Sequence, residues 1–454
     1  METSFRNRKR GHLLSTDHPE VSLTALRARD WLARFTICGL SLVLTLVLVP
    51  AACAQQPLSW SQVEAEFEAA NPALKADADN VDEMRAEEIT AFLRPNPQLG
   101  LSVDGTQPAP HDGVWTPFKG TTEQPNVSYL HEREHKRELR LESAQQGTQI
   151  TQSQHEDLKR NMVFALRTAF VGALQAKFVL DLAKADLDYY DHIIEISRAR
   201  FKAGDLAQVD LDRIELLRVQ YESEIETAIV NLRTAKIQLL QMLDNRTPVD
   251  QFDVTGPFDF NDSLQPLDTY RDAALAARPD LQAALQTVQQ SVTNHKLAVA
   301  NGSADPTFAG WFTNNSSTNN PNGPETIGAS VNIPLRIFDR NQGEKKRTLI
   351  DIDRSQQAEF AARAQVLSDV DSAYELVRSN IELLKPYKAK YNDQALRVRD
   401  TVTFAYQHGG ASLMDFLNAQ SDYRQVQLAY AQLVGSYLVA AGQLNLAVGS
   451  EVLQ

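Results

Sequence analysis

The sequence predicts a mainly α-helical fold with a small β part, built from a duplicated helix-strand-strand-helix-helix unit. Three observations predict it: long apolar seams at coiled-coil spacing, four short segments of alternating polarity, and motifs that recur at one constant separation. The chain has 454 residues, of which 43% are hydrophobic, so it is long enough to bury a core. Its formal net charge of −13 disfavours a nucleic-acid partner.

Two parts of the chain carry the same motifs in the same order. We assign a first repeat to residues 57–245 and a second repeat to residues 264–449, joined by a proline-containing linker over residues 246–267. A separation of 205 residues relates Phe201 to Tyr406, Gly204 to Gly409, Asp210 to Asp415, and Gln220 to Gln425. Because one separation holds across several residue types, the sequence predicts an internal duplication.

Each repeat ends in two very long helices whose apolar residues follow spacings of three and four. In the first repeat this seam covers residues 158–194 and continues on the next helix over residues 217–242. In the second repeat it covers residues 367–405, with Lys388 as an interruption and Pro386 as a predicted kink. Such spacing is typical of coiled coils, so we expect the long helices to pack side by side.

Four shorter segments predict the β part. Apolar residues stand at alternate positions in two of them, and the other two are weaker partners; the segments span about residues 98–104, 126–131, 307–313 and 326–335. A loop with little apolar content separates the two segments of each repeat. The sequence therefore predicts one long-looped hairpin in each repeat.

The first 54 residues predict a secretory signal peptide. A basic stretch precedes the apolar segment at residues 35–50, and the small residues Ala52 and Ala54 flank Cys53 at the expected cleavage site. Alternatively, Cys53 is the lipid-modified first residue of a lipoprotein. Beyond residue 54 there is no uninterrupted run of 18 apolar residues, so we expect any membrane span to be made by strands.

Four strands are too few to close a barrel within one chain. An open strand edge cannot face lipid, because each unpaired backbone group costs several kcal/mol there. Since the smallest closed membrane barrels have about eight strands, identical chains must share the barrel. Three copies of this chain would supply twelve strands.

Three motifs carry a resemblance to a known family. Residues 277–281 (Ala-Arg-Pro-Asp-Leu), 304–308 (Ala-Asp-Pro-Thr-Phe) and 333–343 resemble signatures of the TolC-like outer-membrane efflux family. The resembling branch acts with pumps of the resistance-nodulation-division type, including heavy-metal exporters. The resemblance implies a homotrimer with a 12-stranded barrel in outer-membrane lipid and a helical tunnel in the periplasm. It also implies docking to a periplasmic adaptor (membrane fusion) protein and an inner-membrane pump, with no enzymatic activity and no cofactor.

We expect the two turns between long helices to form the periplasmic tip. Gly204 and Gly409 stand where a helix end needs positive φ, and the following residues offer capping boxes, Asp205 with Gln208 and Ser412 with Asp415. These residues are also what a plain helical hairpin requires. In the family, acids six and nine positions after the second glycine ring a closed entrance. The resemblance therefore implies a gate role for Asp415, with Asn418 at the second position and Asp210 as the first-repeat counterpart.

Two alternatives remain at this stage. One is a periplasmic coiled-coil scaffold or adaptor without a pore, which would have no need for paired half-apolar strands. The other is a zinc metalloprotease, because His131, Glu132 and His135 fit the H-E-x-x-H pattern. Charged residues surround that motif, which favours a solvated boundary between strand and helix. The sequence leaves the exported substrate open among metal cations, drugs and organic solvents.

Overall fold

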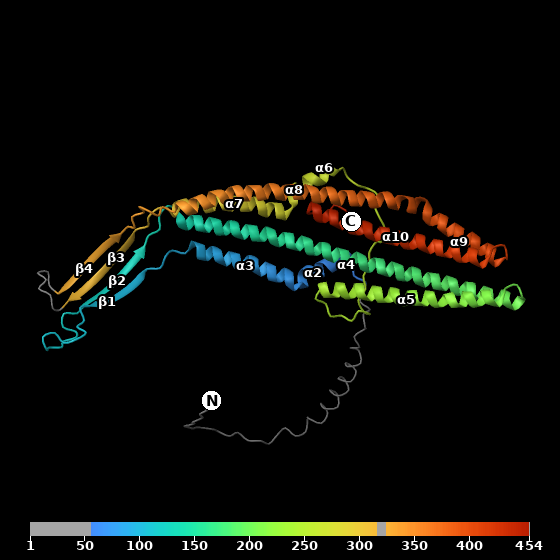
Figure 1. The fold of residues 1–454 in the computed structure, drawn as a ribbon, viewed down its shortest axis with the longest axis horizontal. Coiled ribbons are helices and arrows are strands. Elements are labelled where there is room, and N and C mark those ends of the chain that lie inside the picture. The colour runs from blue at the N-terminus through green and yellow to red at the C-terminus, as the bar shows by residue number, and fades with distance from the viewer. Residues whose placement is uncertain (1–55, 316–323, 454) are drawn as a thin grey trace, which may run out of the picture. The chain divides into compact units, whose positions relative to one another are not determined.

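The computed structural model describes residues 56–315 and 324–453. The predicted signal peptide at residues 1–54, with Cys53, lies outside the described residues. Residues 57–454 form one unit, to which the following description applies. Within this unit the strands lie beside the beginning of the longest helix, and the turns between long helices lie at its other end (Figure 1).

The helices follow the order expected for two repeats. The first repeat contains α2 (Trp60–Ala70), α3 (Pro72–Phe92), α4 (Lys136–Ala203) and α5 (Gln208–Met242). The second contains α6 (Leu267–Ala277), α7 (Pro279–Ala300), α8 (Gln342–Pro386), the π-helical turn η1 (Tyr387–Tyr391), α9 (Asn392–Gln407) and α10 (Leu413–Val448). The predicted mainly helical fold class is thus confirmed.

Each repeat opens with two helices where the sequence predicted one. The break falls at Asn71-Pro72 in the first repeat and at Arg278-Pro279 in the second. Proline lacks an N–H and disfavours helical geometry in the residue before it, so it starts a new helix at its first position. At both breaks the residue before proline, in extended backbone geometry, is the N-cap.

The two N-cap residues, Asn71 and Arg278, also connect the short helices of each repeat to the carboxyl end of a long helix. The Asn71 amide donates to the carbonyl of Met242, the last residue of α5, at 3.0 Å. The Arg278 guanidinium donates to the carbonyl of Ala447 at the end of α10, at 3.3 Å. Both side chains therefore bind a carbonyl that the long helix leaves without an intrahelical partner. A cation at the α10 carboxyl end also complements the helix dipole.

In the described residues, four strands form one antiparallel sheet in the order β1 (Gln98–Asp104), β2 (Thr122–Leu130), β3 (Thr307–Asn315) and β4 (Glu325–Asn332). The two hairpins join because β2 pairs with β3. Strand β2 begins four residues before the expected position, since its polar start pairs with the end of β1. Strand β4 ends three residues before the expected one, because Pro334 has no N–H to donate to a ladder.

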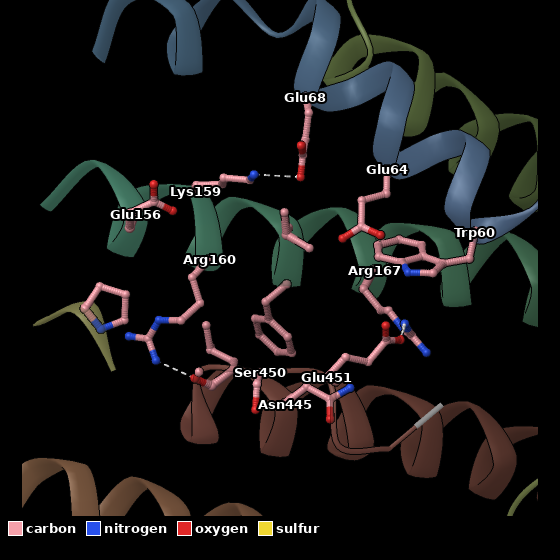
Figure 2. Close-up of a pocket in the computed structure, with 16 residues that line it drawn as sticks. Trp60, Glu64, Glu68, Glu156, Lys159, Arg160, Arg167, Asn445, Ser450 and Glu451 are labelled. Carbon is pink, nitrogen blue, oxygen red and sulfur yellow. Dashed lines mark hydrogen bonds and ion pairs between the residues drawn. The ribbon is translucent and has the colours of Figure 1, made fainter. Parts of the chain in front are cut away.

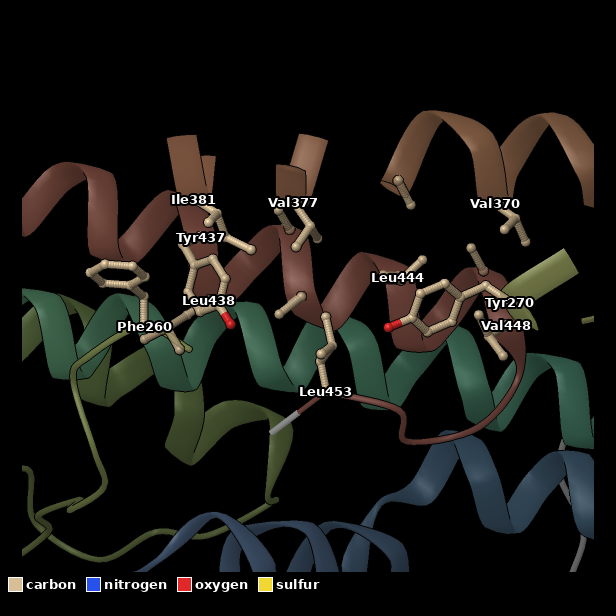
Figure 3. Close-up of a cluster of buried hydrophobic side chains, with 14 of the residues drawn as sticks. Phe260, Tyr270, Val370, Val377, Ile381, Tyr437, Leu438, Leu444, Val448 and Leu453 are labelled. Atoms are coloured by element: carbon tan, nitrogen blue, oxygen red, sulfur yellow. The ribbon is translucent and has the colours of Figure 1, made fainter. Parts of the chain in front are cut away.

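Buried apolar side chains hold the long helices together. One cluster joins α6, α8 and α10, with Val370, Val377 and Leu384 of the predicted seam completely buried (Figure 3). A second joins α2, α4 and the end of α5 around Leu166 and Leu239. The heptad spacing therefore identified the packing face of these helices as far as residue 384.

Beyond Leu384 the predicted seam is wrong. The kink expected at Pro386 is a π-helical turn, which inserts an extra residue into the helical register. The following helix is consequently rotated, and the predicted seam residues Tyr391 and Val398 are exposed. Thr403 and Tyr406 are buried in their place.

Two helices pass a test of length and mean hydropathy for crossing a membrane, contrary to the sequence expectation. They are α4, with 33% of its apolar window buried within the protein, and α10, with 61% buried. The expectation failed because it required an uninterrupted apolar run, whereas Arg167 and Lys177 interrupt the apolar stretch of α4 and uncharged polar residues such as Gln443 and Asn445 interrupt that of α10. Leu166, Phe170 and Leu174 of α4 pack in a helical core, which explains their apolar character without a membrane.

Candidate functional site

The sheet presents an apolar face to the outside of the chain. The register places Leu99 opposite Val127 and Phe308 opposite Val331, so alternate apolar residues of all four strands share one face. Leu101 on this face is 77% exposed and Ile327 is 87% exposed. In water-soluble proteins an antiparallel sheet buries its apolar face and exposes its polar face. This sheet exposes its apolar face, which is the inverse polarity. Membrane barrels show that polarity, with apolar residues toward lipid and polar residues inward.

The opposite face of the sheet is polar. It carries the following small or hydrophilic residues: Ser102, Gln124, Asn126, Ser128, Ser330 and Asn332. Trp311 also lies on it, directly over Gly328, where an added Cβ would clash with the indole. Gly328 thus makes room for a large ring on the polar side. The sheet has two chemically distinct faces and two outer edges, β1 and β4.

The two helix turns at the far end of α4 use glycine as predicted. Gly204 ends α4 with φ 87°, and Gly409 follows α9 with φ 77°. Ser412 caps α10, and its capping box with Asp415 is formed. The expected box of Asp205 with Gln208 is absent, because α5 begins after Ala207, which has no side chain to cap it.

The predicted gate residues lie on exposed or half-exposed positions of these turns. Asp415 and Asn418 are exposed on α10, and Asp210 is half-buried in the first turn of α5. Hydrogen bonds from the Ser412 hydroxyl at 2.7 Å and its N–H at 3.1 Å hold the pKa of Asp415 below its usual value. Asp415 is therefore an exposed, ionised carboxylate at neutral pH.

Three residues outside the predicted gate set, Arg200, Tyr406 and Phe416, hold the two turns together. The Arg200 guanidinium donates to the Tyr406 carbonyl at 2.7 Å and lies over the Tyr406 ring. Tyr406 stacks on Phe416 with 5.2 Å between ring centroids. The available sequence signal was an aromatic residue three positions before each glycine, of which Tyr406 makes this contact and Phe201 is 37% exposed.

Farther from the turns, one carboxylate is buried where four helices meet. Asp186 of α4 is 3% exposed, and among the described residues its Oδ2 accepts no hydrogen bond. Burial raises the pKa of Asp186 to about 6, against the opposing effect of Arg424 on α10 and Arg399 on α9. The Arg424 Nε lies 3.9 Å away, but that guanidinium also pairs with Glu224 of α5. Gln420, one turn before Arg424, is buried as well, and its amide has no partner in the described part of the chain.

A cleft of about 270 Å³ lies between α2, α4 and the end of α10 (Figure 2). Lys159 on its wall pairs with Glu68 at 3.0 Å, and Arg167 pairs with Glu451 at 3.0 Å. Burial raises the pKa of Glu64 between them, with a smaller contribution from Glu451. These charge pairs tie α2 and the chain after α10 to α4.

The zinc-protease motif does not have the geometry that it requires. Residues 131–135 are not helical, so His131 and His135 do not share one helix face. Glu132, which would activate water, instead forms an ion pair with Arg140. His135 lies on the surface with positive φ, directly before α4. The segment is the solvated boundary between β2 and α4 that its charges indicated.

Comparison with known proteins gives consistent matches. Residues 270–450 match the family described as outer membrane efflux protein. The cobalt-zinc-cadmium resistance protein CzcC of Cupriavidus metallidurans is 24% identical over 388 residues, which cover 83% of this chain and 86% of CzcC. The outer membrane efflux protein BepC of Brucella suis is 22% identical over 317 residues, which cover 65% of this chain and 66% of BepC.

Solved structures share the fold. The crystal structure of CusC superimposes with a TM-score of 0.73 at 17% identity, covering 86% of this chain and 92% of CusC. The CmeC outer membrane channel of Campylobacter jejuni gives 0.69 at 15% identity, covering 87% of each chain. The relatives are outer-membrane channels with helical periplasmic parts. With the inverse polarity of the sheet and the motifs above, these matches show that residues 270–450 fit the outer membrane efflux family and that most of the chain is similar to TolC-like outer-membrane efflux proteins.

Proposed function

We propose that this chain is the outer-membrane exit duct of a tripartite efflux system and works as a homotrimer. Three sheets form a 12-stranded barrel, and the long helices form a tunnel that receives cargo from a periplasmic adaptor and an inner-membrane pump of the resistance-nodulation-division type. The observation that best supports this proposal is the sheet itself, which has an exposed apolar face and outer edges at β1 and β4. A pore-free scaffold gives no reason for that face.

The helices offer a second surface for neighbouring copies. On α5, four apolar side chains stand at positions of one seven-residue repeat, interrupted by Ser223, and are each more than half exposed: Val209, Leu216, Val230 and Ile237. Seven-residue spacing is the pattern by which one helix packs along another. A helix of a second copy of the chain can pack against this apolar row on α5, because assembly into a trimer places a helix of the neighbouring subunit beside each outer helix.

We propose divalent transition-metal cations as the first cargo to test, because CzcC is named for resistance to cobalt, zinc and cadmium. The duct performs no covalent chemistry. The pump supplies the energy and most of the selectivity, and Asp415 and Asp210 surround the periplasmic entrance of the closed tunnel.

Planar bilayers test the duct directly. Detergent-extracted protein is expected to migrate as a heat-modifiable trimer and to conduct ions after insertion. Deleting the gene in a strain that expresses the pump encoded beside it is expected to lower the tolerance of the cells to the divalent cations that the system exports. A water-soluble periplasmic monomer without conductance would contradict the proposal and favour the scaffold.

A further inference from the structure

The segment that joins β4 to α8 exposes large apolar side chains beside cations. Over residues 333–341, Leu335 is 80% exposed and Phe338 is 91% exposed, and Ile333 and Ile337 are each more than half exposed. The segment is ordered by its own hydrogen bonds: the Gln342 amide donates to the Phe338 carbonyl at 3.1 Å. It therefore holds an apolar surface outward in a fixed conformation.

Four cations within residues 333–346 lie outside the ion pairs of the described residues, although Arg336, after Lys136, helps to lower the pKa of Asp305. Arg336, Arg340, Lys345 and Lys346 form no ion pair within 4 Å among the described residues. The Arg340 guanidinium donates a hydrogen bond to the Arg336 carbonyl at 3.2 Å. In a chain of net charge −13, this cluster is a local reversal of sign.

The corresponding junction of the first repeat is different. There Lys136 pairs with Asp305 at 2.6 Å, and Arg140 pairs with Glu132. The apolar run is also missing, because residues 131–135 are all polar or charged. The first junction shows that a strand-to-helix junction in this fold needs neither exposed apolar residues nor unpaired cations. The second junction has both features, so they call for a separate explanation.

The position of the segment identifies its surroundings. Strand β4 leads directly through it into α8, so it lies at the helical end of the sheet (Figure 1). It continues the exposed apolar face to which Ile327 and Val331 of β4 belong. If that face contacts lipid acyl chains, the segment lies at the level of the headgroups of the periplasmic leaflet.

We propose that residues 333–346 bind an anionic phospholipid of the periplasmic leaflet of the outer membrane. The headgroup phosphate accepts hydrogen bonds from Arg336 and Arg340, with Lys346 adding charge, and the acyl chains lie on Leu335 and Phe338. Guanidinium groups match phosphate geometry, and each cation near an anionic surface strengthens binding about fivefold. The inference rests on the barrel proposed above.

Native mass spectrometry of the purified trimer tests the site. After detergent extraction with equal phosphatidylglycerol and phosphatidylcholine, the wild-type trimer is expected to retain phosphatidylglycerol selectively. The triple variant Arg336→Gln, Arg340→Gln, Lys346→Gln is expected to lose that selectivity by tenfold or more. The control is Arg347→Gln, Arg354→Gln, Arg363→Gln, which removes three cations that are paired with acids on the same helix. The control is expected to keep wild-type selectivity.

Equal selectivity in the triple variant and the wild type would overturn the inference while leaving the duct intact, provided that the trimer still conducts. A photocrosslinker at Phe338 gives a second measurement in the otherwise unchanged protein. Crosslinks to lipid support the site, whereas crosslinks only to a neighbouring chain would assign the surface to the trimer interface and overturn it. Loss of both trimer and conductance in the wild type would instead refute the proposed function.

Discussion

Asp186 shows how a single buried charge makes a helical protein sensitive to pH. Its carboxylate, on α4, faces Arg424 of α10, Arg399 of α9 and Glu224 of α5, yet burial dominates and raises its pKa to about 6. The folded protein therefore binds a proton that the unfolded chain releases at lower pH. It follows that stability falls as the pH rises from about 4 to about 6 and then stays level.

The variant Asp186→Asn is expected to remove this dependence. At pH 7.5 it should stabilise the protein by on the order of 2 kcal/mol, because no charge is then buried, while at pH 4 it should have little effect. Denaturant unfolding of the trimer at several pH values measures the slope. Asp181→Asn, at an exposed position on the same helix, is the control and should leave the slope unchanged. An unaltered slope in Asp186→Asn would assign the pH dependence to another group.

Asp415 combines two roles that substitution can separate. It completes the capping box of α10 and presents an ionised carboxylate at the tip. Asp415→Ala is expected to raise conductance or to reduce block by multivalent cations, because it removes one charge per chain from the proposed entrance. Ser412→Ala removes the cap and keeps the charge, so block should persist. Single-channel recording with added multivalent cations compares the two, and unchanged conductance and block in Asp415→Ala would exclude the gate role.

At the level of elements, the turn at Gly204 depends on a backbone conformation rather than on packing. Gly204 has positive φ, and a Cβ added there would meet no atom within 4 Å. Gly204→Ala is therefore expected to cost about 1 kcal/mol through conformation alone. Gly172 of α4 also has open space around it but has helical geometry, so Gly172→Ala should be neutral or stabilising. Hydrogen exchange over residues 198–212 should rise in the first variant only, and equal exchange in both would refute the conformational argument.

At the level of the whole molecule, the two sheet faces should respond differently to the same added charge. Leu101 lies on the apolar face and its neighbour Ser102 lies on the polar face, both near the middle of β1. A lysine facing lipid at the bilayer centre costs about 2–4 kcal/mol. Leu101→Lys should thus deplete the assembled trimer, whereas Ser102→Lys should assemble and alter conductance. Quantifying heat-modifiable trimer in outer membranes distinguishes them, and equal assembly would argue against a lipid-facing sheet.

Much of the architecture could be predicted because it is periodic along the chain. Spacings of three and four identified the long helices, and alternation located the β1 strand to the residue. The same reasoning failed at Asp186, since it chose the apolar Leu187 as the seam residue that follows Ala183. In the structure Asp186 is the buried member and Leu187 is only half-buried. A seam assigned from the spacing of apolar residues takes only apolar positions as buried, so it cannot identify a buried charged residue.

The sequence by itself determined the types of element, their duplicated order, the positive-φ turns and the family motifs, because each depends on residues close together in the chain. Only the tertiary structure decided that the hairpins join through β2 and β3, that Arg200 and Tyr406 hold one turn against the other, and that no helix in the described part of the chain covers the apolar face of the sheet. These features depend on contacts between residues far apart in the chain, such as the pairing of Val127 with Gly310. Such contacts form only when the long helices bring both repeats together, and no local pattern encodes them.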